Sequence, residues 1–277
     1  MARDPSPAKS DQIFAAVRRQ DFPGFKLNES LAIGTPFVPM HFHDEPHITL
    51  TLSGACRETY RAKTHELVSL TTTYFHPGES HKLDVMGESF RSFDIQFAPD
   101  WLKRTLKRDL SPPALLSDNA SSIQWLALRL YKEFKEPDEF STLAIEGLIL
   151  EMLADLGRSS KRVNRRRPPS WLSKVSQMLR DEVSRRLTLS ELADCAGVHP
   201  SHLVQVFRAH HQCTPGEFMR RLRIEASIQA MSDPRLSLAD ISLAAGFSDQ
   251  SHFSRVFKRT TGMTPARFRL LCLEKRQ

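Results

Sequence analysis

The first hundred residues alternate apolar and polar positions over short distances. Apolar stretches at Ile48–Leu52, at Leu67–Leu70 and, with clear alternation, at Phe90–Phe97 are separated by Ser-Gly, Pro-Gly and Met-Gly-Glu turn signals. This period of two is typical of strands, whose side chains point alternately to the two faces of a sheet. The pattern therefore predicts antiparallel strands from Lys26 to about Ala98.

The period becomes helical after Pro99. Apolar residues then recur at spacings of three and four over two stretches. These residues are Ile123, Leu126, Leu130 and Phe134 in the first stretch, and Ile145, Leu148, Ile149, Met152 and Leu156 in the second. Two amphipathic helices joined through 136–138 form an αα-hairpin. The pattern leaves open whether their apolar stripe packs on the strands or pairs with another subunit.

A unit of about 50 residues occurs twice in the last third of the chain. Residues 201–208 (SHLVQVFR) recur at 251–258 (SHFSRVFK), an offset of 50. The same offset maps Thr214, Pro215 and Phe218 onto Thr264, Pro265 and Phe268. Upstream, 189–198 (LSELADCAGV) matches 238–247 (LADISLAAGF) at an offset of 49. Such self-similarity indicates that one structural unit has been used twice.

Each repeat has the pattern of a helix-turn-helix. A polar residue (Thr188 or Ser190 in the first repeat, Ser237 in the second) begins a short helix, and an Ala-Gly-apolar turn ends it. A second helix follows, and in this motif its N-terminal turns enter a DNA major groove. The apolar residues of these second helices that we assign to the core are Leu203, Phe207, Phe253 and Phe257.

The segment between the repeats predicts one long helix from Pro215 to Met231. At 1.5 Å per residue it would be about 24 Å long, which suits two recognition helices set about one DNA turn, ~34 Å, apart. The alternative is a helical solenoid of two repeats whose basic residues serve only solubility. Stable solenoids usually need at least three repeats, which favours the DNA-binding interpretation.

Charge divides the chain into unlike parts. The 277 residues carry 39 Lys and Arg against 32 Asp and Glu, a formal net charge of +7. Residues 1–160 hold 18 basic and 22 acidic residues, whereas 161–277 hold 21 and 10. A mildly acidic part joined to a strongly basic one suggests that only the second faces a polyanion. The tract 161–169 (KRVNRRRPP) is typical of a domain boundary, although by itself it is also an ordinary solvated linker.

Composition limits the protein class. With 40% hydrophobic and 26% charged residues, the chain is globular rather than disordered. No run approaches the roughly 18 apolar residues of a membrane span, and no apolar stretch follows the basic N-terminus, so we expect a cytoplasmic protein without a secretory signal. The cysteines Cys56, Cys195, Cys213 and Cys272 form no C-x-x-C pair, which favours reduced and mostly buried thiols.

The segment from about Trp171 to Arg269 resembles the DNA-binding domain of the AraC/XylS family. The resemblance includes the tail that runs from Gly246-Phe247 through 252–258 (HFSRVFK) to 262–269 (GMTPARFR). It implies that bases are contacted by Ser201, Val204 and Gln205 in the first repeat and by Gln250, Ser251, Ser254 and Arg255 in the second. Gln suits adenine, Arg suits guanine and Val suits a thymine methyl. We expect phosphate contacts from Arg208, Lys258, Arg259 and Arg267; for any one of these residues, a solvated surface role is the alternative.

Six of the eleven histidines lie between positions 41 and 81. The spacing Gly34-(x6)-His41-x-His43-(x3)-His47-(x6)-Gly54, followed by Pro-Gly-Glu-Ser-His81, resembles the two motifs of the cupin β-barrel. On a strand, His41 and His43 share a face. The resemblance implies that His81 is the last ligand of a metal site. His47 stands where metal-binding cupins have Glu, and His76 stands where the motif has Pro.

Three interpretations of the candidate set His41, His43, His47 and His81 remain open. Four imidazoles suit a divalent transition metal such as Zn, Fe, Ni or Cu. The same residues could instead hydrogen-bond an organic effector or lie near the surface. A metal-dependent cupin enzyme of the dioxygenase or isomerase type, with secondary DNA binding, is the alternative function. An enzyme has little use for a basic double helix-turn-helix, so we favour a non-enzymatic regulator.

Together these features predict a multidomain α+β protein. It consists of a cupin-like antiparallel β-barrel sensor (1–100), a helical hairpin that could dimerise (101–158), a basic linker (159–167) and an all-α double helix-turn-helix domain (168–272). The predicted function is that of a one-component, effector-responsive transcription regulator. Its expected partners are double-stranded DNA, a small-molecule or metal effector, RNA polymerase and a second copy of the chain, with no membrane.

Overall fold

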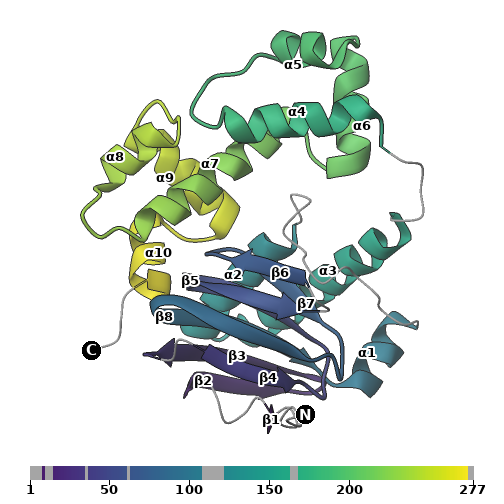
Figure 1. Cartoon of the computed structure of the whole chain (residues 1–277), viewed down its shortest axis with the longest axis vertical. Coiled ribbons are helices and arrows are strands. Elements are labelled where there is room, and N and C mark those ends of the chain that lie inside the picture. Colours follow the sequence, from purple (N-terminus) through teal and green to yellow (C-terminus); the bar gives the residue numbers. More distant parts are fainter. Residues whose placement is uncertain are drawn as a thin grey trace, which may run out of the picture. The chain divides into compact units, whose positions relative to one another are not determined.

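The computed structural model describes residues 8–9, 15–34, 37–60, 63–107, 122–162 and 168–273 (Figure 1). The chain falls into two compact units, one built from the strands and helices up to Arg162 and one from the helices beginning at Ser170. The helix that precedes the second unit continues to Arg162, into the segment 159–167 expected as a linker. Residues 163–167 of that segment lie outside the described residues.

Within the described residues, the first unit contains one sheet of eight strands. They are β1 (Ala8–Lys9), β2 (Ala15–Phe22), β3 (Phe25–Ile33), β4 (Phe37–Phe42), β5 (His47–Tyr60), β6 (Lys63–Leu67), β7 (Thr72–Phe75) and β8 (His81–Phe97). Every pairing is antiparallel except that of the two-residue β1 with β4. The antiparallel sheet predicted from the alternation is thus confirmed.

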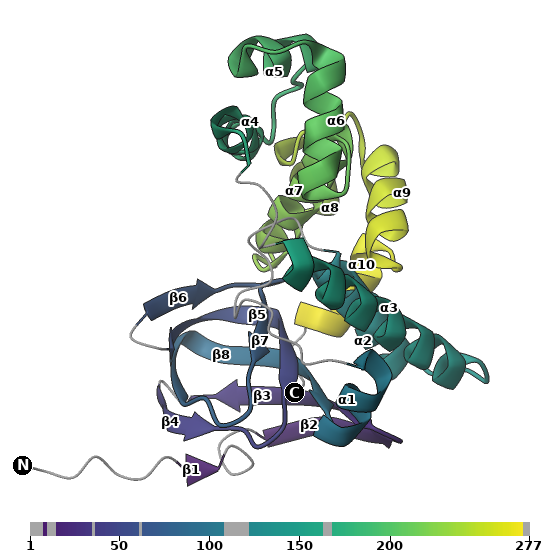
Figure 2. The same ribbon diagram turned by 90° about the vertical axis from the view of Figure 1, so that its right-hand side faces the viewer.

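Strand β8 is the centre of this sheet. Its first residues pair with β4 on one side and β5 on the other, whereas 89–97 pair with β3 and β5. Register shifts between Thr51 and Ala55 interrupt the β5–β8 ladder near its middle. Irregularities of this kind bend strands. The long strands β5 and β8 accordingly curve the sheet into a barrel-like shape (Figure 2).

Three helices belong to the described part of the first unit, and the first two of them contact β3 and β8 through aromatic rings. These helices are α1 (Pro99–Leu106), α2 (Ile123–Lys135) and α3 (Ser141–Arg162). The ring of Phe93 on β8 lies 5.2 Å from the rings of both Tyr131 and Phe134 on α2, measured between centroids. The apolar stripes predicted for α2 and α3 are buried. The hairpin is confirmed, and α2 is the helix whose contacts join it to the strands.

A buried ion network reinforces this contact. The Glu29 side chain on β3 is fully buried; Lys135 binds one of its oxygens at 2.7 Å and Arg91 lies 3.6 Å from the other. The Tyr131 hydroxyl also donates to Glu29, at 3.0 Å. A buried carboxylate is tolerated when cations and hydrogen bonds surround it in this way. Glu29 therefore fixes where α2 lies on the sheet.

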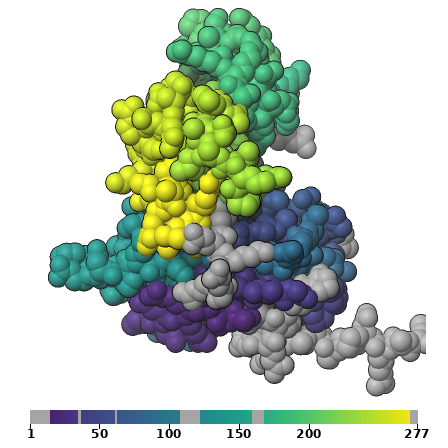
Figure 3. Space-filling model, turned by 90° about the vertical axis from the view of Figure 1, so that its left-hand side faces the viewer, coloured from purple at the N-terminus to yellow at the C-terminus, as the bar shows by residue number. Residues whose placement is uncertain are grey.

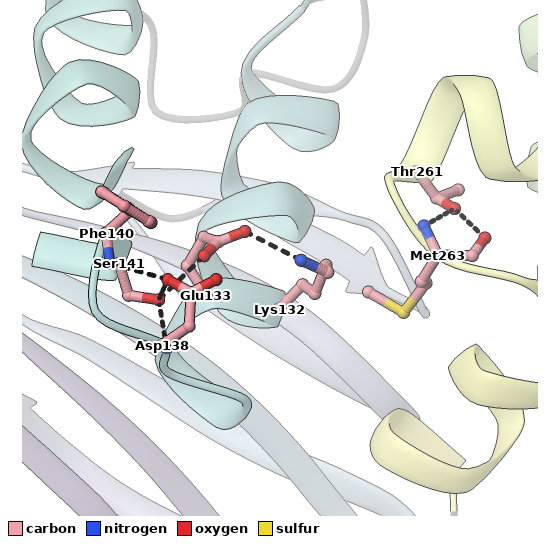
Figure 4. A network of polar contacts seen from close by, with 7 residues as sticks. All are labelled: Lys132, Glu133, Asp138, Phe140, Ser141, Thr261 and Met263. Atoms are coloured by element: carbon pink, nitrogen blue, oxygen red, sulfur yellow. Dashed lines mark hydrogen bonds and ion pairs between the residues drawn. The ribbon is translucent and has the colours of Figure 1, made fainter. Parts of the chain in front are cut away.

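Short-range polar contacts close the turn between α2 and α3 (Figure 4). The buried Ser141 hydroxyl lies 3.0 Å from an oxygen of Glu133 and 3.1 Å from an oxygen of Asp138. The backbone N–H of Phe140 donates to Asp138 at 2.9 Å. These contacts begin α3 directly after α2, which makes the two helices antiparallel neighbours.

The second unit is helical throughout its described residues. Its helices are α4 (Ser170–Asp181), α5 (Leu189–Ala196), α6 (Pro200–His211), α7 (Pro215–Met231), α8 (Leu238–Ala244), α9 (Gln250–Thr261) and α10 (Pro265–Phe268), followed by a π-helical segment, Arg269–Leu273. The single helix predicted between the repeats is α7, with the predicted ends. Thr188 rather than Ser190 caps α5, in a capping box with Glu191, and Ser237 caps α8 as predicted.

The two repeats pack their cores in the same way. In the first, the ring centroids of Phe207 and Phe218 lie 5.3 Å apart in an edge-to-face contact. In the second, the pair at the same offset of 50, Phe257 and Phe268, lies 5.6 Å apart in the same arrangement. The four residues assigned to the core from the sequence are all fully buried. A buried Thr261 hydroxyl closes the turn after α9 by bonding the backbone of Met263 (Figure 4).

Contacts around the loop 182–187 join the two repeats to each other. Arg223 on α7 donates to the carbonyl oxygens of Val183 at 2.9 Å and Arg185 at 3.0 Å. Its guanidinium also lies 6.0 Å from the ring centroid of Phe247 in the second repeat. Gly246 has a φ of +80°, and a Cβ placed there would be 2.6 Å from the carbonyl oxygen of Ser184.

No helix in the described part of the chain is long and apolar enough to cross a membrane. Cys56, Cys195 and Cys213 are free thiols; Cys56 and Cys213 are buried, whereas Cys195 is exposed.

The contact of Gly246 with Ser184 generates a stability prediction with a matched control. Gly197, the equivalent turn residue of the first repeat, also has a positive φ (+64°) but has no atom within 4 Å of the added Cβ. Gly197→Ala should lower the free energy of unfolding by about 1–2 kcal/mol through backbone strain alone. Gly246→Ala should lower it by roughly 1–3 kcal/mol more because of the steric clash. Urea unfolding followed by circular dichroism measures both; equal losses would contradict this assignment.

Candidate functional site

The inside of the curved sheet holds a pocket of about 420 Å³. Its wall combines the histidine cluster, a patch of uncharged and acidic polar side chains, two basic side chains and a set of apolar residues. The apolar residues are Ala16, Phe42, Leu67, Phe75, Leu83 and Phe90. A pocket of this size accommodates a small organic molecule.

All four candidate histidines lie at this pocket, because three strand ends meet there. His41 is on β4 and His43 follows the end of that strand, whereas His47 and His81 are the first residues of β5 and β8. A register shift in β4 between Val38 and His41 allows both of these residues, three positions apart, to be buried. The bulge thus changes the strand's alternation.

The imidazole rings form a compact cluster. One ring nitrogen from each of His41, His43 and His81 lies within 4.8 Å of the others. The His47 ring stacks on Phe75 at 4.5 Å and lies 4.0 Å from the His43 ring, measured between centroids, but His47 is outside that group of three. Three candidates are therefore placed as a set of ligands would be, with His47 beside them.

Backbone carbonyls orient three of the rings. The Nδ1 atoms lie within hydrogen-bonding distance of the carbonyl oxygen two residues earlier, at 2.9 Å for His41, 3.3 Å for His47 and 3.4 Å for His81. A carbonyl oxygen can only accept, so Nδ1 carries the proton and Nε2 keeps its lone pair. Within the described structure, Nε2 of His41 is buried and has no hydrogen-bond partner. Metal-ligating histidines are usually oriented in this way, so the donor set fits a transition metal.

Burial keeps these imidazoles neutral. Burial lowers the pKa of His41, and burial together with the neighbouring His41 and His43 lowers the pKa of His81 to about 3. The pKa of His47 is well below its usual range, first because of burial and then because of His43 and His81. A neutral imidazole can bind a metal or accept a hydrogen bond, whereas a protonated one can do neither.

The wall also contains a polar patch that the sequence analysis did not identify. Asn28 on β3, Asp94 on β8 and Thr49 on β5 are neighbours in register across three strands. Ser30 and Ser92 form the next row. All five line the pocket. In the sequence these polar residues alternate with the apolar residues Leu27, Ile95 and Ile48. Only the register of the three strands brings the polar residues side by side.

The residues expected to contact DNA lie on the sides of α6 and α9 opposite to the core. On α6 the expected contact residues are exposed, except that Val204 is half-buried. On α9 they are exposed, except that Ser254 is half-buried. Arg267, on α10, is half-buried. The set comprises Ser201, Val204, Gln205 and Arg208 on α6, Gln250, Ser251, Ser254, Arg255, Lys258 and Arg259 on α9, and Arg267. The only expected contact residue outside the two recognition helices is therefore Arg267.

Comparison with protein families gives matches to both units. Residues 32–153 match the model of the AraC-like ligand binding domain, and residues 192–270 match the model of a helix-turn-helix domain.

Individual proteins match the same regions. The chain is 33% identical over 99 residues to the probable transcription factor PqrA of Proteus vulgaris, an alignment that covers 36% of this chain and 77% of that protein. It is 21% identical over 249 residues to the HTH-type transcriptional activator RhaR of Mannheimia succiniciproducens, covering 87% and 90% of the two chains. A crystal structure of ToxT from Vibrio cholerae aligns with 91% of this chain and 99% of its own at 15% identity and a TM-score of 0.40. The relatives matched in sequence are named as regulators of transcription, which supports a regulator over a cupin enzyme.

Proposed function

This chain belongs to the AraC family of transcription regulators, and on that premise we propose how its two units divide the work. The helical unit binds duplex DNA through α6 and α9, and the pocket of the sheet unit binds an effector that controls this activity. The observation that carries the proposal is the duplicated helix-turn-helix, whose two second helices both bury their aromatic residues and leave a polar, basic side exposed. A regulator of this kind acts on the chromosome, so we also propose a cytoplasmic protein.

The exposed residues of α6 and α9 have two different roles in this proposal. Ser201, Val204, Gln205, Gln250, Ser251, Ser254 and Arg255 contact base edges, whereas Arg208, Lys258, Arg259 and Arg267 contact phosphates. The division follows position along each helix, because the N-terminal turns enter the groove and later turns meet the backbone. Helix α7, with Arg223 and the Gly246 turn, keeps the two recognition helices at a constant separation.

The histidine cluster is the part of the pocket that we propose as the effector or metal site. His41, His43 and His81 would supply ligand nitrogens, and His47 would complete the set or support His43. Neutral imidazoles suit Zn, Fe, Ni or Cu, and replacement of the usual Glu by His47 removes a negative charge that harder ions prefer. The oriented rings and the unpartnered Nε2 of His41 support this assignment.

A second copy of the chain is the partner that we propose for α3. Its buried side faces its own unit, but Leu143 and Leu150 are 72% and 51% exposed, with Gly147 exposed between them. Spacings of four and three put these residues on one stripe of the helix. Figure 3 shows that the hairpin (teal) projects from the rest of the sheet unit. Two such stripes can pair about a two-fold axis. RNA polymerase remains an expected partner to which we assign no residues.

DNA binding should separate the two proposed residue roles. Arg255→Ala should relax the preference for one base position and cost about 1–3 kcal/mol on the preferred sequence. Arg259→Ala should weaken all sequences similarly and reduce the slope of log affinity against log salt by about one. The full chain and both variants would be assayed by selection from a random duplex pool and by fluorescence anisotropy at several salt concentrations. Equal effects of the two changes would refute the assignment, and salt-independent binding would refute DNA recognition itself.

Metal analysis should decide between the two forms of effector site. Purified full chain equilibrated with Zn²⁺ should retain about one ion per chain, as expected for a single three- or four-ligand site. His41→Ala should reduce affinity by more than the roughly 10–100-fold seen when only an outer hydrogen-bond partner is lost. His65→Ala, a change on β6 outside the pocket wall, is the control. Metal-free wild type would leave an organic effector as the only ligand of the cluster.

The proposed dimer can be tested by placing charge on the α3 stripe. Leu150→Glu should raise the dimer dissociation constant at least tenfold, or about 1.4 kcal/mol, because it would bury an unpaired carboxylate. Stability of the monomer should change by less than about 0.5 kcal/mol since the side chain is exposed. Analytical ultracentrifugation over a concentration series measures the association, with the exposed Glu151→Gln as control. A wild type that stays monomeric, or a variant that dimerises as well, would count against this surface.

A further inference from the structure

The hydroxyl groups of the polar patch donate their hydrogen bonds within the patch itself, to Asp94. The Thr49 hydroxyl lies 2.7 Å from one oxygen of Asp94, and the Ser30 and Ser92 hydroxyls lie 3.3 and 3.4 Å from the other. A carboxylate can only accept, so each hydroxyl points its single proton at Asp94. What these three hydroxyls still offer to the pocket is lone pairs.

Asn28 continues the same pattern. Its amide nitrogen donates to the Ser30 hydroxyl oxygen at 2.7 Å. Its carbonyl oxygen is buried and, within the described residues, has no hydrogen-bond partner. A buried acceptor without a partner is unfavourable, so this oxygen marks a place where a hydrogen-bond donor of a ligand would be favourable. Gln96, the next residue along β8 on this wall, has an amide that can turn either edge to the pocket.

The charge of Asp94 is also uncompensated. Basic side chains at the pocket wall are paired elsewhere: Lys26 binds Glu45 at 3.1 Å, and Arg19 binds Asp21 at 3.1 Å. Among the residues that the structure describes, no cation forms an ion pair with Asp94. Burial raises the pKa of Asp94 to about 6, against the effect of its three hydroxyl partners. At neutral pH the carboxyl is therefore mostly ionised.

We propose that Asn28, Thr49 and Asp94 form a second subsite of the pocket, which binds a protonated amine of the effector. An ammonium group donates up to three hydrogen bonds and accepts none, which complements a surface that offers mainly acceptors. It also supplies the positive charge that Asp94 lacks, and hydrogen bonds to charged groups are the stronger kind. A neutral polyol needs donors as well as acceptors, and this wall offers it few donors. The inference rests on the proposed function insofar as this pocket is the effector site.

Pairs of probes with the same skeleton test the subsite without knowledge of the natural effector. We would titrate the full chain with cyclohexylamine and cyclohexanol, and with phenethylamine and phenethyl alcohol, by isothermal titration calorimetry at neutral pH. In each pair only the amine is cationic, while size and apolar surface are nearly equal. Each amine should bind roughly ten- to a hundredfold more tightly than its alcohol. Equal affinities, tighter binding of the alcohols, or no binding of either amine would overturn the inference.

Substitutions then locate the preference. Asp94→Asn keeps the shape and removes the charge, and should abolish the advantage of the amines. Asn28→Ala removes the unpartnered carbonyl and should reduce amine affinity severalfold, which covers the case that Asp94→Asn does not fold. Asp84→Asn, on the same strand but outside the pocket wall, is the matched control and should behave as wild type. Amine binding that is indifferent to both pocket substitutions would overturn the subsite.

Failure of this inference is distinguishable from failure of the proposed function. DNA binding of wild type and Asp84→Asn is measured with and without phenethylamine. An amine preference that depends on Asp94 but leaves DNA affinity unchanged would support the subsite while contradicting effector control through this pocket. Salt-dependent DNA binding together with no amine preference would overturn only the subsite.

Discussion

The register of β3, β8 and β5 is the constraint on which the sheet unit depends. Because side chains alternate between faces, one register places Leu27, Ile95 and Ile48 on the outside, against the helices, and puts Asn28, Asp94 and Thr49 in the pocket. A shift of the strand register by one residue would turn the apolar set into the pocket and the polar set toward the helices. The outer face also contains Glu29, whose contacts with Lys135 and Tyr131 hold α2 in place. One alignment of strands thus creates both the helix-binding face and the pocket.

The DNA-binding unit depends instead on a repeated aromatic contact. Phe207 packs against Phe218 and Phe257 against Phe268, and each pair ties a recognition helix to the helix that follows it. These contacts fix the inner side of α6 and α9 and so decide which residues face outward. Arg223 then joins the repeats, since it bonds the loop after α4 and lies against the second repeat. Rigid spacing of the two helices follows from these local contacts.

Much of this architecture could be predicted from residues close together in sequence. The ends of α7, the caps at Thr188 and Ser237, and the burial of Phe207 and Phe257 all follow from patterns within about one repeat. The convergence of His41, His43 and His81 was also predictable, although their grouping depends on the pairing of two strands, β4 and β8. The place of His47 beside the group of three, stacked on Phe75, was not.

The sequence by itself determined the order of the elements, the duplication and the chemistry of the histidine segment, because caps, periods and turns act between near neighbours. Only the tertiary structure decided that Thr49, Ser30 and Asp94 meet, since these residues are 45 and 64 positions apart. It likewise decided that α2 packs on the strands while Leu143 and Leu150 of α3 stay exposed. Strand register and helix docking are settled by total burial across the unit, and no local pattern contains that information.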